Sequence, residues 1–224
     1  MAESIKVDVW SDVACPWCYI GKRTLEAAVS EISADGDGPE IVIEYHSYEL
    51  APETPVDFVG GEHEFLIGSK GMTADESREM LKHVTEVAGT VGLEYNYDRL
   101  QHANTVMAHQ LVHYAKAHGK QIDANERLLK AHFSDGRHIG RVEDLADLAE
   151  EIGLDRADVV RSLESDEYLS AVRADQELAR SYGISAAPFF VFDGRNSISG
   201  AQDKDVFVQA LEQAVRDRGE VMHD

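Results

Sequence analysis

Hydrophobic and polar residues alternate at the start of the chain, and the spacing changes after about ten residues. Ile5, Val7 and Val9 alternate with polar neighbours, a period of two that is typical of a strand with one buried face. From Pro16 onward, apolar residues recur at about helical spacing, at Ile20, Leu25, Ala28, Val29 and Ile32. The pattern predicts a strand over residues 5–10 and a helix that begins at Pro16, because proline is best tolerated at the first helical position.

The rest of the chain first repeats the pattern of a strand and then becomes mainly helical. A turn at residues 35–39 leads to a second β-rich run at residues 41–46, and a loop follows over residues 51–61. Helical patterns then dominate, over residues 73–89, 104–118, 124–133, 142–152 and 156–163. The pattern in the last part of the chain predicts a helix over residues 167–182 and a hairpin with an Asp-Gly turn over residues 189–199. A final helix is predicted over residues 203–216.

The order of these elements predicts the fold class. The two ends of the chain supply a βαβ unit and a ββα unit, which are the parts of a thioredoxin-like fold. The long helical stretch between them predicts an insertion. We therefore expect an α/β protein in which residues 1–60 and 165–224 form a discontinuous thioredoxin-like domain and residues 61–164 form an all-helical subdomain.

Composition narrows the range of functions. The 224 residues are 43% hydrophobic, as in a folded protein, and 21 basic against 42 acidic residues give a net charge of −21. Such an acidic surface repels nucleic acid phosphates and anionic lipids, so we expect neither as a partner. The first residues lack the pattern of a signal peptide, and no apolar run approaches the ~18 residues of a membrane span, which predicts a cytoplasmic protein.

The two cysteines of the chain, Cys15 and Cys18, lie where the first strand gives way to the first helix. A disulfide between two cysteines this close in sequence cannot link distant segments of the chain, so a redox pair is the leading interpretation. The alternatives are inert thiols or half of a zinc site, which His109 and His113, one helical turn apart, would have to complete. As the helix N-cap, Cys15 faces unpaired amides and the positive end of the helix dipole, so we expect a moderately lowered thiol pKa. Cys15 is then the nucleophile and Cys18 the resolving residue.

The residues around the cysteines resemble a known family. Trp10-Ser11-Asp12, Cys15-Pro16-Trp17-Cys18-Tyr19 and Gly21-Lys22-Arg23 resemble the start of FrnE-like proteins, members of the DsbA-like thioredoxin superfamily. The resemblance continues through nearly the whole chain, in Tyr48–Pro52, Asn104-Thr105, Ala108-His109, Gly183–Phe192 and Ser199–Gln202. It implies a DsbA-like thiol–disulfide oxidoreductase.

The resemblance also implies roles for single residues. Pro188 should be cis and lie against the cysteines, and the backbone of Ala187 should hydrogen-bond an extended substrate. Asn104 and His109 are expected either to face the active-site groove or simply to cap and pack the helix. Pro16 and Trp17 are candidate substrate contacts, with Trp17 and Tyr19 as exposed aromatic side chains and Lys22 and Arg23 as solvated charges.

The leading functional prediction is a cytoplasmic thiol–disulfide oxidoreductase with no bound cofactor or metal. Glutathione or another thiol is a possible co-substrate, and the partner is a protein or small-molecule thiol or disulfide. Two alternatives stay open. One is a glutathione-dependent isomerase or transferase of the 2-hydroxychromene-2-carboxylate isomerase or kappa class, and the other is a redox-regulated binding module. The sequence predicts no oligomeric state.

Overall fold

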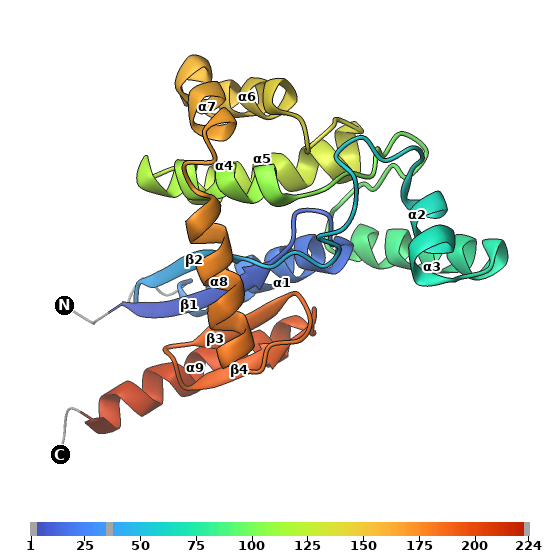
Figure 1. Ribbon diagram of the computed structural model, residues 1–224. Coiled ribbons are helices and arrows are strands. Elements are labelled where there is room, and N and C mark those ends of the chain that lie inside the picture. Colours follow the sequence, from blue (N-terminus) through green and yellow to red (C-terminus); the bar gives the residue numbers. More distant parts are fainter. Residues whose placement is uncertain (1–3, 35–37, 222–224) are drawn as a thin grey trace.

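The computed structural model describes residues 4–34 and 38–221 (Figure 1). The predicted turn at residues 35–39 and the two ends of the predicted thioredoxin-like domain lie partly outside the described residues. The strands are β1 (Ile5–Ser11), β2 (Ile41–Ser47), β3 (Phe189–Phe192) and β4 (Asn196–Ser199). They match the strands that the alternating patterns predict.

The four strands form one sheet in the order β2-β1-β3-β4. β1 and β2 are parallel, with Val7 opposite Ile43, as expected for two strands joined by a crossover helix. β3 runs antiparallel to β1, with Val9 opposite Phe190, and β4 completes the hairpin. The two ends of the chain therefore meet in the middle of the sheet, and the α/β, thioredoxin-like expectation is confirmed.

Helices surround this sheet. Helix α1 (Pro16–Ile32) joins β1 to β2, and all regular structure between β2 and β3 is helical among the described residues. Its helices are α2 (Glu62–Lys70), α3 (Ala74–Thr90), α4 (Val106–Ala117), α5 (Gln121–Lys130), the π-helical turn η1 (Ala131–Asp135), α6 (Val142–Glu151), α7 (Arg156–Glu164) and α8 (Leu169–Ser181). Helix α9 (Lys204–Val221) ends the described chain. No helix among the described residues is long and apolar enough to cross a bilayer.

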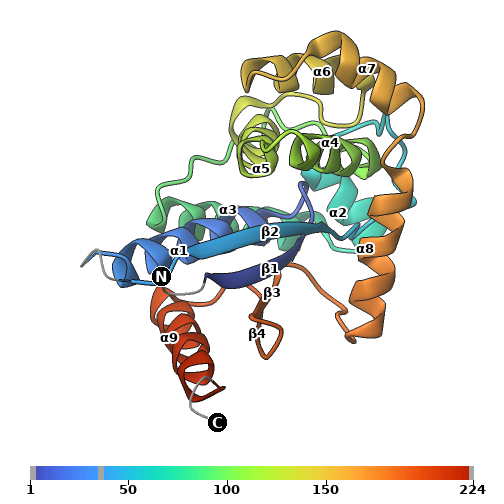
Figure 2. The same cartoon turned by 90° about the vertical axis from the view of Figure 1, so that its left-hand side faces the viewer.

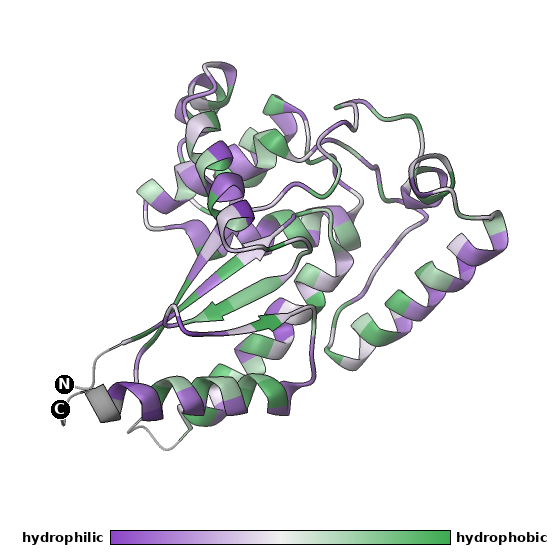
Figure 3. Cartoon of the chain, turned by 60° about the horizontal axis from the view of Figure 1, so that its bottom comes forward, coloured by the Kyte–Doolittle hydropathy of each residue, from purple (hydrophilic) through white to green (hydrophobic). Residues whose placement is uncertain are grey.

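The helices form layers on the sheet (Figures 1 and 2). Helix α1 packs against α9, which also contacts β1, β3 and β4, while α5 and α8 contact β2. Helices α6 and α7 pack on α4 and lie farthest from the sheet (Figure 2). Figure 3 shows largely apolar strands and helices that alternate apolar and polar residues, as expected for elements with one buried face.

One hydrophobic cluster runs from the sheet into the helical segment. It includes Val7 of β1, Leu111 of α4, Leu128 of α5 and Leu145 of α6, each 1% exposed or less. The sheet and the inserted helices therefore share buried contacts. The division at residues 61 and 164 stays a prediction.

Helix α2 is the element that the sequence patterns did not predict. It has nine residues, and only Phe65 and Leu66 among its apolar residues are buried. Its start depends on Gly61, whose amide donates a 2.8 Å hydrogen bond to the Glu64 carboxylate. So short a helix shows too little periodicity to be recognised from its own sequence.

Candidate active site

Cys15 lies directly after β1, at the N-cap of α1, with Pro16 as the first helical residue. Its backbone is extended, with φ −95° and ψ 114°, and its amide donates to the Asp12 carbonyl at 3.1 Å. The Cys18 amide in turn donates to the Cys15 carbonyl at 3.0 Å, so Cys18 follows in the first turn of the helix. Both residues are free thiols. The local geometry is the one that the Pro16 position predicts.

The loop before β3 closes over Cys15. The Ala187–Pro188 peptide bond is cis, as the resemblance implies, and the Cys15 Sγ lies 3.7 Å from the Ala187 carbonyl oxygen, within reach of a thiol hydrogen bond. Gly21 allows α1 to approach this loop, because a Cβ at that position would lie 3.3 Å from the Pro188 ring and 3.1 Å from Phe190. The chain thus brings two segments about 170 residues apart to one sulfur.

A cavity of about 220 Å³ opens beside Cys15. Four of the predicted site residues line it, namely Cys15, Pro16, Trp17 and Ala187, whereas Cys18 does not. The opposite wall comes from helices α2 and α3, with Phe65, Leu66, Met80 and Val84. The sequence patterns predict α3 but not α2, so they do not identify this wall.

The thiol pKa is where the sequence expectation was wrong. Cys15 is only 4% exposed and Cys18 only 3%. The hydrogen bond with Cys18, followed by burial and by the electrostatic effect of the neighbouring Cys18 sulfur, raises the pKa of the Cys15 thiol well above its usual value. In this closed, reduced geometry these effects outweigh the helix N-terminus, which alone would lower the pKa.

Asp12 is a buried carboxylate directly behind the cysteines. Its amide lies 3.5 Å from the Cys18 sulfur, and its side chain accepts from the Leu50 amide at 2.7 Å and the Ala14 amide at 3.3 Å. Burial alone would raise the pKa of Asp12, but contact with His109 and these amides outweighs it and lowers the pKa. Asp12 therefore places a negative charge beside the dithiol, which adds to the raised pKa of Cys15.

The two helical-segment candidates lie behind this site, outside the residues that line the cavity. Asn104 donates to the carbonyls of Pro52 and Thr54 at 2.9 and 3.0 Å and accepts from the Val106 amide at 2.8 Å. It therefore starts α4 and fastens the loop after β2 to it. His109 is 2% exposed, and its Nε2 lies 3.4 Å from Asp12 Oδ1. Its contact with the cysteines is thus indirect, through Asp12.

Three polar residues of the cavity were missed by the sequence analysis. Glu62 of α2 pairs with His102 at 2.8 Å, and the His102 ring stacks on Phe65 at 3.6 Å between centroids. The Tyr97 hydroxyl is buried and has no hydrogen-bond partner among the described residues. Burial, together with the charges of Glu62 and Cys15, raises the pKa of Tyr97 above its usual value. The hydroxyl is therefore neutral, and it belongs to a residue that lines the cavity.

Two expectations about exposed side chains were wrong. Tyr19 is 2% exposed and donates to Glu126 at 2.7 Å, because it lies against α5 rather than at the mouth of the site. Lys22 is 3% exposed and pairs with Glu26 and, at 2.7 Å, with Glu126. Trp17 is half-buried and packs near the His83 ring. The helical segment thus covers a face of α1 that the sequence pattern left open.

The histidines suggested for a zinc site point to different partners. His109 faces Asp12, whereas His113 Nε2 lies 2.9 Å from Asp175 and 3.2 Å from the Ser47 hydroxyl. Among the described residues, neither histidine forms a group with the two sulfurs that is close enough to hold a metal ion.

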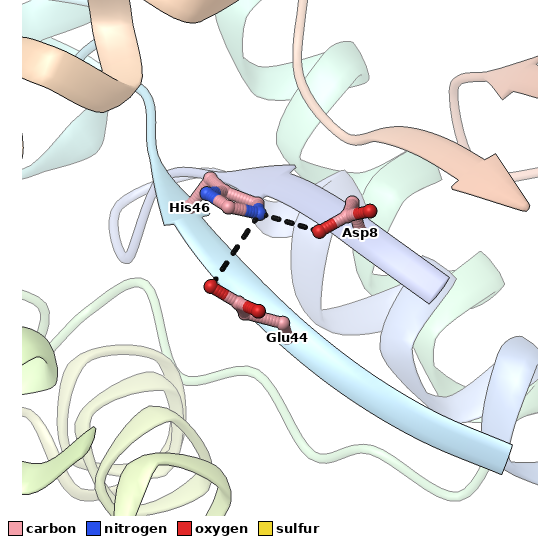
Figure 4. Close-up of side chains that lie close together, drawn as sticks. All are labelled: Asp8, Glu44 and His46. Atoms are coloured by element: carbon pink, nitrogen blue, oxygen red, sulfur yellow. Dashed lines mark hydrogen bonds and ion pairs between the residues drawn. The ribbon is translucent and has the colours of Figure 1, made fainter. Parts of the chain in front are cut away.

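A separate cluster joins Asp8 of β1 to Glu44 and His46 of β2 (Figure 4). His46 Nε2 lies 2.7 Å from Asp8 and its Nδ1 lies 2.9 Å from Asp175 of α8. Burial alone would lower the pKa of His46, but its hydrogen bonds with Asp175 and Asp8 raise it to about 9. Lys6 pairs with Asp8 at 2.7 Å and Glu44 at 2.8 Å, so cations of the chain already neutralise these carboxylates.

Comparison with known proteins adds to this geometry. The model of the DSBA-like thioredoxin domain family matches residues 6–212. The uncharacterized protein YwbO of Bacillus subtilis is 30% identical over 216 residues, which cover 93% of this chain and 96% of that protein. A probable DsbA oxidoreductase from Streptomyces coelicolor superposes with a TM-score of 0.85 at 33% identity, over 94% of this chain and 89% of its own.

Two more distant structures share the fold. A 2-hydroxychromene-2-carboxylate isomerase has a TM-score of 0.68 at 17% identity, over 96% of this chain and 98% of its own. The cytosolic disulfide reductase DsbM from Pseudomonas aeruginosa, solved with GSH, has a TM-score of 0.62 at 16% identity, over 98% of this chain and 100% of its own. At these identities the likeness concerns the fold alone.

Proposed function

Because the chain belongs to the DSBA-like thioredoxin domain family, we propose that it is a thiol–disulfide oxidoreductase that works through the Cys15–Cys18 pair. The resemblance to the DsbA-like thioredoxin superfamily is thereby confirmed, while the narrower FrnE-like label stays a prediction. A C-x-x-C pair at the N-terminus of the first helix, with a cis-proline loop against it, is the arrangement on which the proposal rests.

The observation that supports separate roles for the two cysteines is their different position relative to the cavity. Cys15 lines the cavity, and Cys18 lies behind it, against the Asp12 amide. A disulfide that enters the cavity meets Cys15, which attacks it and forms a mixed disulfide. Cys18 then attacks the Cys15 sulfur, forms the internal disulfide and releases the second thiol.

Protonation controls the first step. A hydrogen bond with Cys18 and burial raise the pKa of the Cys15 thiol, which must lose its proton before it can attack a disulfide. A substrate that separates the two sulfurs removes the hydrogen bond that raises the pKa of Cys15. Asp12 opposes the thiolate, which stabilises the disulfide relative to the ionised dithiol and favours action as a reductant in a compartment such as the cytoplasm.

The electrons must come from an external thiol, because the chain has no third cysteine. Glutathione is one candidate co-substrate, supported by the GSH-containing structure of DsbM with the same fold. No protein partner or oligomeric state is part of the proposal.

A glutathione-dependent isomerase is the second candidate, supported by the likeness in fold to 2-hydroxychromene-2-carboxylate isomerase. Such an enzyme needs one thiol or hydroxyl, not two. The Cys18→Ser variant therefore separates the candidates: it stops redox turnover after one mixed disulfide, whereas isomerisation of a thiol adduct would continue. A redox-regulated binding module would form stoichiometric complexes in the wild type as well.

The experiment that tests the proposal is a redox titration of the Cys15–Cys18 pair against glutathione buffers, followed by Trp17 fluorescence. We expect a reversible two-electron transition that the Cys15→Ser and Cys18→Ser variants lack. The matched control is Ser33→Ala, at the C-terminal end of the same helix. If no transition occurred, the oxidoreductase proposal would be wrong.

A further inference from the structure

The cavity beside Cys15 has a chemical character of its own, beyond the reactivity of the sulfur. Its wall is mainly apolar, and the larger apolar side chains include Trp17, Leu50, Phe65, Leu66, Met80 and Val84. Transfer of an apolar group from water to such a wall is favourable in proportion to the area buried. The cavity therefore favours ligands with an aromatic or branched aliphatic group.

Access to the sulfur limits the size of the ligand. Cys15 is 4% exposed, held between the Ala187 carbonyl and the helix that it caps. A disulfide must enter the cavity of about 220 Å³ to reach it. That volume is of the size that takes a small molecule, and it fits a small disulfide better than one held in the surface of a folded protein.

The charges at the cavity disfavour anionic ligands. Two carboxylates line it, Asp12 and Glu62, and Glu62 is already paired with His102. The one Lys or Arg side chain among the lining residues, Lys70, has its Nζ 5.8 Å from the centre of the Phe65 ring. A glutathione moiety carries two carboxylates, which would lose hydration here, and Lys70 could pair with only one of them.

One polar contact is left for a ligand. Tyr97 is one of the residues that line the cavity, and its buried hydroxyl has no hydrogen-bond partner among the described residues. A buried donor without a partner costs free energy, which an acceptor on a ligand would recover. The acceptor can be a carbonyl, a hydroxyl or a ring nitrogen.

We infer that this site takes small, neutral disulfides with an aromatic or branched apolar group and one hydrogen-bond acceptor, in preference to glutathione disulfide and polypeptide disulfides. The inference rests on the oxidoreductase function proposed above and names its substrate class. In the reaction the Cys15 thiolate attacks one sulfur of R–S–S–R and expels the first RS⁻. Cys18 then attacks Cys15 and expels the second. The two protein thiols lose two electrons and two protons, and the substrate becomes two RSH.

The test compares oxidation of the reduced protein by four disulfides, followed by Trp17 fluorescence. They are 4,4′-dithiodipyridine, which is neutral and aromatic with ring nitrogens; dithiobis(nitrobenzoate), aromatic but anionic; glutathione disulfide; and insulin. Each second-order rate constant is divided by that of the same disulfide with dithiothreitol, which cancels intrinsic reactivity. Salt at about 0.5 M screens the repulsion of anions by the acidic surface.

We expect the normalised constant for 4,4′-dithiodipyridine to exceed those of the other three by at least about tenfold, the size expected for burial of one aromatic ring. Met80→Lys puts a cation in the wall and should reduce the preference over dithiobis(nitrobenzoate) at least about fivefold. Thr90→Lys, the same charge change at an exposed position of α3 outside this cavity, should leave the ratio unchanged. Tyr97→Phe should slow 4,4′-dithiodipyridine about three- to tenfold, the value of one hydrogen bond.

The outcomes separate the inference from the function on which it rests. Oxidation by every disulfide with no preference, a preference for glutathione disulfide or insulin, or equal effects of Met80→Lys and Thr90→Lys would overturn the inference and leave the oxidoreductase function intact. An unchanged rate in Tyr97→Phe would overturn the role assigned to that hydroxyl. Failure of all four disulfides to oxidise a folded protein would refute the function, and the inference with it.

Discussion

The raised pKa of His46 predicts that the stability of the protein falls between neutral and alkaline pH. His46 lies between Asp8 and Asp175 at 2.7 and 2.9 Å, and its ring stacks on Trp10 at 4.5 Å between centroids. The protonated ring thus joins β1, β2 and α8. Its pKa of about 9, against 6.5 for a free histidine, makes the folded state the stronger proton acceptor.

The sign and size follow from proton linkage. Because the folded pKa is the higher one, the stabilisation is fully present below about pH 6.5 and is lost as the pH rises through about 9. At 1.36 kcal/mol per pKa unit, the shift corresponds to at most about 3 kcal/mol. We expect a measured loss of about 2–3 kcal/mol, because His46 shares Asp175 with His113.

The assay is urea unfolding of the Cys15→Ser, Cys18→Ser double variant between about pH 6 and 9.5, since removal of the thiols removes their own titration. His46→Gln in that background should be less stable at pH 6 and nearly independent of pH over the same window. The control is His118→Gln, at the end of α4, which should keep the full slope. A free energy of unfolding that stays level between pH 6.5 and 9, or an unchanged slope in His46→Gln, would refute the reasoning.

Three further predictions concern buried charges. Asp12→Asn removes the anion beside the dithiol, so the pKa of Cys15 should fall. The pH dependence of iodoacetamide alkylation measures this, and Asp57→Asn should leave it unchanged. Burial lowers the pKa of His132 to about 3, so its neutral ring stabilises the folded state above pH 6.5, and this stabilisation is lost as the pH falls toward 3. His132→Leu should therefore lose less stability between about pH 7 and 4, measured as the urea concentration at the unfolding midpoint. Glu126→Ala, which leaves buried Lys22 one carboxylate, should lower the free energy of unfolding by about 2–4 kcal/mol, whereas Lys22→Met changes it by less than about 1 kcal/mol.

The local features of the site could be predicted because they depend on residues close in sequence. Proline at the first helical position places Cys15 at the N-cap, and alternating apolar residues define β1 through their own period. The Asp193–Gly194 turn likewise predicts the hairpin of β3 and β4. The cis bond at Pro188 was implied by family resemblance rather than by local pattern.

The features that failed depend on what packs against these elements. Tyr19 and Lys22 read as surface residues of α1, because the Glu126 side chain that binds them lies about 100 residues away on α5. Helix α2 has too few buried apolar residues to produce a helical pattern in the sequence, yet it supplies part of one wall of the cavity. The spacing of apolar residues along the sequence does not show which distant element packs against a helix.

The thiol of Cys15 shows most clearly which properties depend on neighbours in sequence and which depend on the tertiary structure. By itself the sequence determined that Cys15 caps a helix and that Cys18 follows in its first turn, since hydrogen bonds between near neighbours decide both. Only the tertiary structure decided how acidic and accessible that thiol is. The Ala187 loop, the buried Asp12 and helices α2 and α3 come from distant parts of the chain, and burial and charge depend on proximity in space rather than in sequence.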